Sequence, residues 1–381
     1  MSERGHICIY LKESLRHFLG VKGHAEGKGH SMDIVVLAGG LSPERDVSFT
    51  GGGMIAAALI DRGHRVCLCD PYTGMGADGA EPYFADSPLP PEADQGIGRE
   101  APDLDRLKAT SGRGELRIAP GVIDLCRRAD MVFVALHGDV GEDGRLQALL
   151  DMEAIPHTGS GYAGCLLAMD KDISKQLFRQ AGILTPDWVR CDLSRMSPEA
   201  AVSRIKDEIG TPCVIKPCSC GSSVGVTLVD TEEELVAAVT AAGRFGTDIL
   251  AERRIIGREL TVSVLGRRVL PAVEILPHEG FYDYENKYRP GAVEEICPAD
   301  LTLPVASALA DAAQRGFDVL RLTGYARFDF MLDADGTPWC LEANALPGMT
   351  GTSLLPRAAA AIGLDYPSLC EEILRLAMTK R

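Results

Sequence analysis

Two carboxylates and a carboxamide near the C-terminal end of the chain could together bind a magnesium ion. Glu342 and Asn344 lie two residues apart in a predicted strand, so period-two alternation places them on one face. Asp329 lies in a second predicted strand, residues 326–332, and an Asp-Gly turn at residues 335–336 joins the two strands as a hairpin. Carboxylate and amide oxygens suit Mg²⁺, which shares its coordination shell with phosphates and water. The alternative is a surface hairpin with solvated acids.

A lysine followed by a turn of small residues could bind phosphate. Lys216 ends a predicted strand, and Pro-Cys-Ser-Cys-Gly-Ser-Ser follows it, where backbone N–H groups and hydroxyls can approach phosphate oxygens. The segment is not a Walker A loop, because no Gly-Lys-Ser/Thr opens a helix here. The first strand also lacks the Gly-x-Gly-x-x-Gly dinucleotide pattern. A plain hairpin turn is the alternative for this segment.

Other polar residues stand at predicted strand ends or in an unusual loop. Glu252 and Glu259 flank a predicted hinge and could hold the adenine amino group and the ribose hydroxyls. The loop of residues 281–288 contains three tyrosines and a phenylalanine, which indicates a lid over a ligand, or else a packed loop without one. Glu44 and His137 follow strands at one predicted sheet edge, where α/β folds place ligand-facing loops. The alternatives are a helix-start charge and a structural histidine.

Composition and charge exclude several classes of protein. The chain has 381 residues and a net charge of −15, which argues against binding to nucleic acid or to an acidic membrane surface. Its 12 cysteines are scattered and include no Cys-x-x-Cys motif. No apolar run approaches the length of a membrane span, and the start lacks the features of a signal peptide. We therefore expect a cytoplasmic protein.

The apolar pattern predicts a leader and three lobes, with an α/β fold that is α+β in the central and C-terminal lobes. Residues 1–31 are expected to be a disordered leader, either an upstream-start artefact or a dispensable tail. A genuine extension that packs on the first lobe or on a dimer partner is the alternative. Residues 32–161 predict an N-terminal parallel-sheet lobe, residues 162–258 a small central lobe, and residues 259–381 a C-terminal lobe with the metal site.

Within these lobes, the pattern predicts several further elements. A surface excursion is expected from residue 72 to about residue 120. A single helix is expected from residue 162 to residue 181, with Leu166, Leu167, Ile173, Leu177 and Phe178 on its apolar side. The C-terminal lobe is expected to contain a strand at residues 269–275, an irregular loop at residues 278–297 and one C-terminal helix after the hairpin.

Taken together, these residues resemble the D-alanine–D-alanine ligases, members of the ATP-grasp family. The likeness extends from Met32 to about Ala377, and the order and spacing of its segments make it more specific than any single motif. The matching segments are residues 39–48, 135–138, 141–144, 157–161, 169–171, 216–226, 281–288, 326–332 and 342–353. Cys218 and Cys220 depart from the family pattern, so sensitivity to thiol reagents is expected.

The resemblance implies a three-lobed ATP-grasp enzyme. It would join two D-alanines to D-alanyl-D-alanine for peptidoglycan precursor synthesis, with ATP as co-substrate and an acyl phosphate as intermediate. It further implies two Mg²⁺ ions per site, with Mn²⁺ able to replace them and K⁺ as an additional candidate. The expected partners are D-alanine, ATP and a second copy of the chain in a homodimer.

The resemblance also implies roles for individual residues. The metal ligands would be Asp329, Glu342 and Asn344. The residues near ATP would be Lys171, Lys216, Ser223, Glu252, Arg253, Ile255, Glu259, Phe281, Lys287 and Asn344. The residues around the two D-alanines would be Glu44, Val47, His137, Arg327, Gly348, Ser353 and Leu354. The catalytic set would be Glu44, Ser222, Tyr288, Arg327 and Ser353, with Tyr288 linked to Ser222 and Glu44 so that it orders the closing loop.

Three alternatives remain at this stage. The second substrate could be D-serine or, less readily, D-lactate, since similar D-lactate ligases tend to have histidine where this chain has Tyr288. A different ATP-grasp carboxylate–amine ligase would not need the segments around Glu44 and Tyr288. A nucleotide-binding regulatory protein without catalysis should have lost a metal ligand or a lysine, and this chain retains them all.

Overall fold

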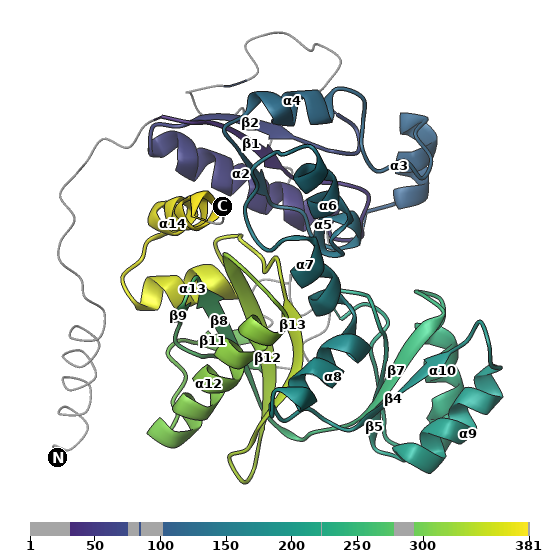
Figure 1. The fold of residues 1–381 in the computed structure, drawn as a ribbon. Coiled ribbons are helices and arrows are strands. Elements are labelled where there is room, and N and C mark those ends of the chain that lie inside the picture. The colour runs from purple at the N-terminus through teal and green to yellow at the C-terminus, as the bar shows by residue number, and fades with distance from the viewer. Residues whose placement is uncertain (1–30, 75–83, 85–101, 222, 278–292, 380–381) are drawn as a thin grey trace, which may run out of the picture. The chain divides into compact units, whose positions relative to one another are not determined.

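The computed structural model describes residues 31–74, 84, 102–221, 223–277 and 293–379 (Figure 1). The predicted leader, residues 1–31, therefore lies outside the described residues except for Ser31. No helix within the described ranges is both long and apolar enough to cross a lipid bilayer.

The N-terminal lobe is built on a parallel sheet of three strands in the order β2-β1-β3. The strands are β1 (Asp33–Leu37), β2 (Arg65–Cys69) and β3 (Met131–Val134). Most of their residues are buried, as is typical of parallel strands. The neighbouring helices are α2 (Arg45–Asp61), α4 (Val122–Arg128), α5 (Asp139–Glu142) and α6 (Arg145–Met152). These elements confirm the predicted parallel-sheet lobe at the start of the fold.

The predicted surface excursion is partly helical. Helix α3 (Leu104–Ser111) begins where the Asp103 side chain accepts a hydrogen bond from the Arg106 backbone N–H. None of its residues is buried, so no apolar stripe marks the helix in the sequence. The helix lies at the surface, in keeping with the predicted excursion, and a local cap stabilises it.

The single helix predicted for residues 162–181 is two helices, α7 (Tyr162–Met169) and α8 (Lys171–Gln180). Asp170 between them has extended backbone, with ψ of 102°, and its side chain caps α8 at the Ile173 N–H. The predicted apolar side is also partly wrong, because Leu166 is 51% exposed and Ile173 is 37% exposed. The buried residues of α8 are Lys171, Ser174, Lys175 and Phe178.

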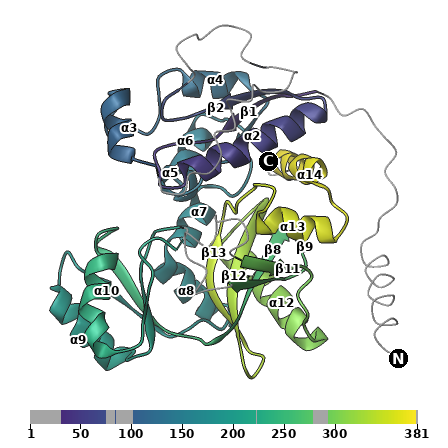
Figure 2. The same cartoon turned by 180° about the vertical axis from the view of Figure 1, so that it is seen from behind.

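A second, antiparallel sheet follows in the order β4-β7-β5-β6. Its strands are β4 (Trp188–Asp192), β5 (Cys213–Pro217), β6 (Thr227–Val229) and β7 (Asp248–Arg253). The helical elements are α9 (Pro198–Glu208), η2 (Glu232–Glu234) and α10 (Leu235–Ala242), and Figures 1 and 2 show α9 and α10 on the side away from α8. The Ser197 side chain caps α9 at the Ala200 N–H, and Thr231 and Glu234 form a capping box.

The third sheet has the order β11-β10-β8-β12-β13, and β9 pairs with β8. Its strands are β8 (Gly257–Leu265), β9 (Arg268–Val269), β10 (Val273–Pro277), β11 (Val293–Ile296), β12 (Tyr325–Asp333) and β13 (Pro338–Asn344). The strand predicted for residues 269–275 is interrupted, and Pro271 in the gap has no N–H for a ladder bond. Strand β11 replaces the end of the predicted loop; residues 278–292 lie outside the described residues.

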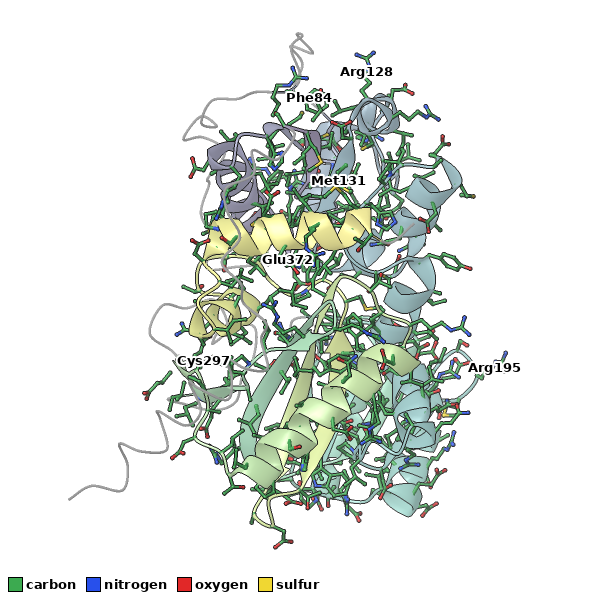
Figure 3. All side chains as sticks on the ribbon, turned by 60° about the vertical axis from the view of Figure 1, so that its left-hand side comes forward. Phe84, Arg128, Met131, Arg195, Cys297 and Glu372 are labelled. Carbon is green, nitrogen blue, oxygen red and sulfur yellow. The ribbon has the colours of Figure 1, made fainter. Side chains whose placement is uncertain are left out.

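Three helices complete this region, α12 (Leu303–Val319), α13 (Leu354–Ala361) and α14 (Tyr366–Met378). The chain thus ends in two helices rather than the single one predicted. Ile373 and Leu374 of α14 are fully buried in the same core as Met131 of the N-terminal sheet. In Figure 3, Met131 lies inside the N-terminal lobe, and Arg128 projects outward from it. Arg195 projects outward from the central lobe. The C-terminal helix therefore contributes to the core of the first lobe.

Candidate active site

The sheet formed by β8, β12 and β13 has one polar face and one apolar face. Backbone pairing places Asp329 opposite both Thr261 and Glu342, and it places Arg327 opposite Asn344. Residues that alternate with these pack into the core of this lobe: Leu260, Val262, Phe328, Phe330 and Ala343. The predicted hairpin is confirmed, including the shared face of its two acids and one amide.

Short polar contacts hold the residues of this face together. The Asp329 carboxylate accepts bonds from Arg327 Nε at 2.8 Å, Thr261 Oγ1 at 2.9 Å and Asn344 Nδ2 at 3.0 Å. The Glu342 carboxylate lies 3.4 Å from Lys171 Nζ. Two cations thus balance the two acids, and the same face can accept both a divalent metal ion and a polyphosphate.

The donor set suits Mg²⁺ only if the amide is included. Among the described residues, no group of three or more His, Cys, Asp and Glu side chains is placed to hold a metal ion. Asp329 and Glu342 would supply two carboxylates, and the Asn344 amide oxygen would supply the third protein ligand. A site with few protein ligands leaves positions for water and phosphate, which is typical of Mg²⁺ at nucleotides.

Lys171 is the first residue of α8 and is buried beside the turn between β5 and β6. Its Nζ donates a hydrogen bond to the Cys220 carbonyl at 2.7 Å, and it lines a hollow together with Glu142, Gly221, Glu342 and Asn344. Burial alone would lower the pKa of Lys171, but the nearby Glu342 carboxylate is the main opposing cause, and the net effect of the surroundings raises the pKa. Lys171 therefore carries a positive charge in the hollow at neutral pH.

The turn after Lys216 approaches the N-terminal lobe. Ser223 has a φ of +57°, in the left-handed region that non-glycine residues seldom adopt. A Cβ on Gly221 would lie 2.9 Å from Glu44 Oε2, so only glycine allows the Glu44 carboxylate to come so close. The candidate phosphate turn and the candidate ammonium-binding acid thus lie side by side.

Glu44 also faces His137 and a second buried acid, Glu142. Burial is the main cause that lowers the pKa of His137, and the Glu44 charge opposes it. The Glu142 carboxylate accepts a hydrogen bond from the Gly138 N–H at 2.8 Å. Burial, aided by the Glu44 charge, raises the pKa of Glu142 to about 8. At neutral pH Glu142 is therefore mainly protonated. Glu142 belongs to residues 141–144, a segment that resembles the ligase family, but the resemblance implied no role for it.

The start of α13 provides the candidate site for a carboxylate. Ser353 occupies the N-cap position, and its Oγ accepts a hydrogen bond from the Thr350 N–H at 2.9 Å. A Cβ on Gly348 would lie 2.8 Å from Ser353 Oγ, so the backbone passes close to this hydroxyl. The helix start favours an anion, and Leu354 is the first helical residue. Val47 is buried on α2.

The candidate base-binding residues belong to two sheets. Glu252 on β7 lies 2.6 Å from Lys216 Nζ on β5 and 2.9 Å from Lys175 Nζ on α8. Arg253 is exposed, and its guanidinium lies 5.1 Å from the centre of the Trp339 ring. Ile255 is half-buried after β7, whereas Glu259 belongs to the polar face of β8.

Sequence reasoning missed Lys175, because the expected stripe of α8 placed apolar residues on the buried side. Four predicted site residues lie outside the described part of the chain: Ser222, Phe281, Lys287 and Tyr288. Of the others, the structure brings together Lys171, Glu342, Asp329, Asn344 and Arg327 as one group. It brings Glu44 and His137 together as a second group at the same turn.

Comparison with known proteins gives consistent matches along the chain. The family model for the D-ala D-ala ligase N-terminus matches residues 33–160, and the one for the C-terminus matches residues 177–375. A D-alanine–D-alanine ligase of Synechococcus sp. (strain JA-3-3Ab) is 39% identical over 92% of this chain and 94% of its own length. One from Anaeromyxobacter dehalogenans (strain 2CP-C) is 38% identical over 91% of this chain and 97% of its own length.

Solved structures agree with these sequence matches. The crystal structure of the ligase from Bacillus anthracis complexed with ATP superposes with a TM-score of 0.70 at 26% identity, covering 92% of this chain and 98% of that one. The ligase from Coxiella burnetii also has a TM-score of 0.70 at 26% identity, covering 92% of this chain and 95% of that one. The geometry, the family models and the relatives lead to one conclusion, that this chain belongs to the D-alanine–D-alanine ligase family and has its ATP-grasp fold.

Proposed function

We propose that this protein joins two molecules of D-alanine into D-alanyl-D-alanine and converts ATP to ADP and phosphate. The observation that carries the proposal is the polar face on which Asp329, Glu342 and Asn344 meet the cations of Arg327 and Lys171. This arrangement can hold a triphosphate and a metal ion beside the Glu44–His137 group, which can hold an amino acid.

The chemistry requires activation of a carboxylate. A carboxylate oxygen of the first D-alanine attacks the γ-phosphorus, the bond to the β–γ bridging oxygen breaks, and an acyl phosphate and ADP form. The neutral amine of the second D-alanine attacks the acyl carbon, and the C–O bond breaks to release phosphate. The amine loses one proton in this step. Lys171, Lys216 and Arg327 offset the negative charge that develops during both steps.

Two magnesium ions held by Asp329, Glu342 and Asn344 would neutralise phosphate oxygens and fix the triphosphate, and Mn²⁺ could replace them. The carboxylate and amide oxygens of these residues fit such ions, because they are hard donors that lie on one face of the hairpin. Potassium dependence stays a prediction from the resemblance. Removal of divalent metal by a chelator should abolish phosphate release.

The two D-alanines need different partners. Glu44 would hold the ammonium of the first D-alanine near His137. Ser353 and the N–H groups at the start of α13 would hold the carboxylate of the second one, with Leu354 beside it. Arg327 and the Gly348 backbone would stabilise the anionic intermediate. Water must be excluded, because an acyl phosphate hydrolyses.

A phosphate-release assay with ATP and Mg²⁺ tests the function and its alternatives together. D-Alanine alone should give phosphate and an equal amount of dipeptide, identified by mass. Faster product formation when D-serine or D-lactate is added with D-alanine would favour the alternative acceptors. Absence of phosphate release with any of the three would contradict the proposal.

We propose a homodimer in the cytoplasm, and lobes divided at residues 31/32, 161/162 and 258/259. Light scattering of the purified protein tests the homodimer, and limited proteolysis tests the lobe boundaries.

A further inference from the structure

Helix α8 carries two buried lysines one turn apart, and the proposed chemistry uses only one of them. Lys171 serves the hollow beside Glu342, whereas Lys175 is 0% exposed. Residues four apart lie on the same face of a helix, so both ammonium groups extend from one side of α8. A fully buried lysine needs a counter-ion, because transfer of its charge out of water is costly.

The counter-ion of Lys175 is Glu252, the candidate adenine-binding acid. Lys175 Nζ lies 2.9 Å from Glu252 Oε2, and Lys216 Nζ lies 2.6 Å from Glu252 Oε1. One buried carboxylate is therefore shared between two lysines. The neighbouring Cys340 thiol adds no negative charge, because burial raises its pKa far above neutral pH. Burial lowers the pKa of Lys175, the Glu252 charge opposes this effect, and Lys216 adds to the lowering. The cluster of Lys175, Glu252 and Lys216 thus has a single carboxylate for two amines.

The two lysines differ in how firmly they are held. Lys175 also donates a hydrogen bond to Thr185 Oγ1 at 2.6 Å, and its Nζ lies 5.3 Å from the centre of the Trp188 ring. Lys216 stands near the end of β5, immediately before the candidate phosphate turn, and its hydrogen bond is to Glu252. Lys175 is therefore fixed on several sides, while Lys216 is tied to the carboxylate and adjoins the nucleotide-binding segment.

The two lysines also keep the carboxylate charged. Burial would raise the pKa of Glu252, but the combined effect of Lys175 and Lys216 lowers it. If Lys175 were absent, Lys216 would be the sole partner of a buried carboxylate. Releasing it to another anion would then leave Glu252 unpaired, which is strongly unfavourable.

We propose that Lys175 is a positioning residue for the nucleotide: it holds Glu252 from the side of α8, so that the Lys216 ammonium can turn to an ATP phosphate. Two lysines share one carboxylate in this cluster, and a polyphosphate would supply a second anionic partner. This inference rests on the proposed function, because that function makes ATP the nucleotide.

Lys175→Met separates this role from a purely structural one. The variant leaves Glu252 paired with Lys216, so no buried charge becomes uncompensated and the cluster becomes neutral. Without nucleotide, the melting temperature should stay within a few degrees of the wild-type value. Affinity for Mg²⁺–ADP, measured by calorimetry without D-alanine, should fall about tenfold or more, comparable to the loss of one charged contact. In the ligation assay, KM for ATP should rise while KM for D-alanine changes little.

A double-mutant cycle with Glu252→Gln tests whether Lys175 acts through Glu252. Lys175→Met should weaken Mg²⁺–ADP binding much less in the Glu252→Gln background than in the wild-type background. The matched control is Lys206→Met, which removes a surface lysine that lies 2.7 Å from Glu232 in the same lobe. The control should leave the affinity for Mg²⁺–ADP unchanged. If Lys175→Met does not fold, Lys175→Gln, which can still donate to Thr185, replaces it throughout.

Three results would overturn the inference: unchanged Mg²⁺–ADP affinity, an equal loss in both backgrounds, or a loss accompanied by an equally large fall in stability. These results are separate from the test of ligation. If the wild-type protein makes dipeptide but the double-mutant cycle shows no coupling between Lys175 and Glu252, the role of Lys175 is rejected and the proposed function stands. If Lys175 and Glu252 are coupled in Mg²⁺–ADP binding but the protein makes no dipeptide, the proposed function is rejected and the role of Lys175 stands.

Discussion

The charge of the Glu342 carboxylate is the most consequential single feature of the candidate site. Glu342 lies opposite Asp329 in the hairpin and 3.4 Å from Lys171 Nζ, so it adjoins both the second acid and the lysine proposed to bind phosphate. Glu342→Gln keeps the shape of the side chain but removes the charge that a metal ion needs. We expect kcat to fall at least about a hundredfold, as for loss of a key electrostatic group. Steady-state kinetics measures this effect.

The matched control is Glu372→Gln on α14, where the acid pairs with Arg375 at the surface. The control should keep wild-type kcat, and both variants should melt near the wild-type temperature. A folded Glu342→Gln enzyme with near-normal kcat would remove Glu342 from the metal site.

Glu142 should make stability depend on pH. Its pKa is raised from 4.5 to about 8, chiefly by burial and then by Glu44, so the folded chain holds a proton that the unfolded chain releases. Stability should therefore decline as pH rises from about 5 to 8, because ionisation is favoured in the unfolded chain. Glu142→Gln cannot ionise, so its melting temperature relative to wild type should increase steadily over this range. Thermal melts at several pH values measure this difference in melting temperature between the variant and the wild type. A difference that does not change with pH would count against a buried, protonated Glu142.

The turn between β5 and β6 offers a test at the level of an element. The sequence predicts that both Cys218 and Cys220 are sensitive to thiol reagents, but Cys218 is 2% exposed and burial raises its pKa to about 12. Cys220 is half-buried, and its carbonyl accepts the Lys171 hydrogen bond. A maleimide should therefore label Cys220 faster than Cys218, and Mg²⁺–ATP should slow the labelling of Cys220.

Cys297 serves as the internal reference for this labelling experiment, since it is also half-buried and directly follows β11 (Figure 3). Its rate of labelling, followed by peptide mass mapping, should not respond to ATP. Equal protection of Cys220 and Cys297 would indicate a general change in the protein rather than a nucleotide at the turn.

Elements defined by neighbouring residues could be predicted from the sequence, and those defined by distant contacts could not. The Asp-Gly turn at residues 335–336 depends on local backbone conformation, with Gly336 at a φ of +79°, and it was predicted. The division of the helix at Asp170 was not predicted, because the surrounding apolar residues suggest one continuous stripe. The buried face of α8 depends on partners such as Glu252, which is 77 positions after Lys175 in the chain and has no periodic signal.

The same distinction applies to the candidate site. Period-two alternation and an Asp-Gly turn suffice to place Asp329 and Glu342 on one face. The approach of Glu44 to Gly221 requires the packing of two lobes. The predicted sheet edge suggested that Glu44 faces a ligand, but only the family resemblance gave it a role beside the first D-alanine. Neither source indicated the pKa of Glu142, which depends on burial in the folded protein.

For the whole molecule, α14 links the end of the chain to the first lobe. Ile373 is fully buried in the core that also contains residues of α2 and of the N-terminal sheet (Figures 1 and 2). Ile373→Ala should destabilise the protein by about 2–5 kcal/mol, because it removes buried methyl groups and leaves a cavity. The melting temperature of the variant should fall by several degrees, while the folded enzyme keeps the wild-type KM for ATP.

Glu371→Gln is the control for the same helix, since the Glu371 side chain is 42% exposed and pairs with His64. It should change the melting temperature much less than Ile373→Ala does. An Ile373→Ala protein as stable as wild type would show that α14 does not support the N-terminal core.

The central claim is that the polar face activates a carboxylate as an acyl phosphate, and an isotope experiment tests it most directly. The enzyme would be given ATP, Mg²⁺ and D-alanine with both carboxylate oxygens labelled as ¹⁸O, and the released phosphate would be analysed by mass. Attack by the amine at the acyl carbon leaves one substrate oxygen on phosphorus. We therefore predict one ¹⁸O atom in each phosphate released together with dipeptide. Phosphate without ¹⁸O would contradict the account.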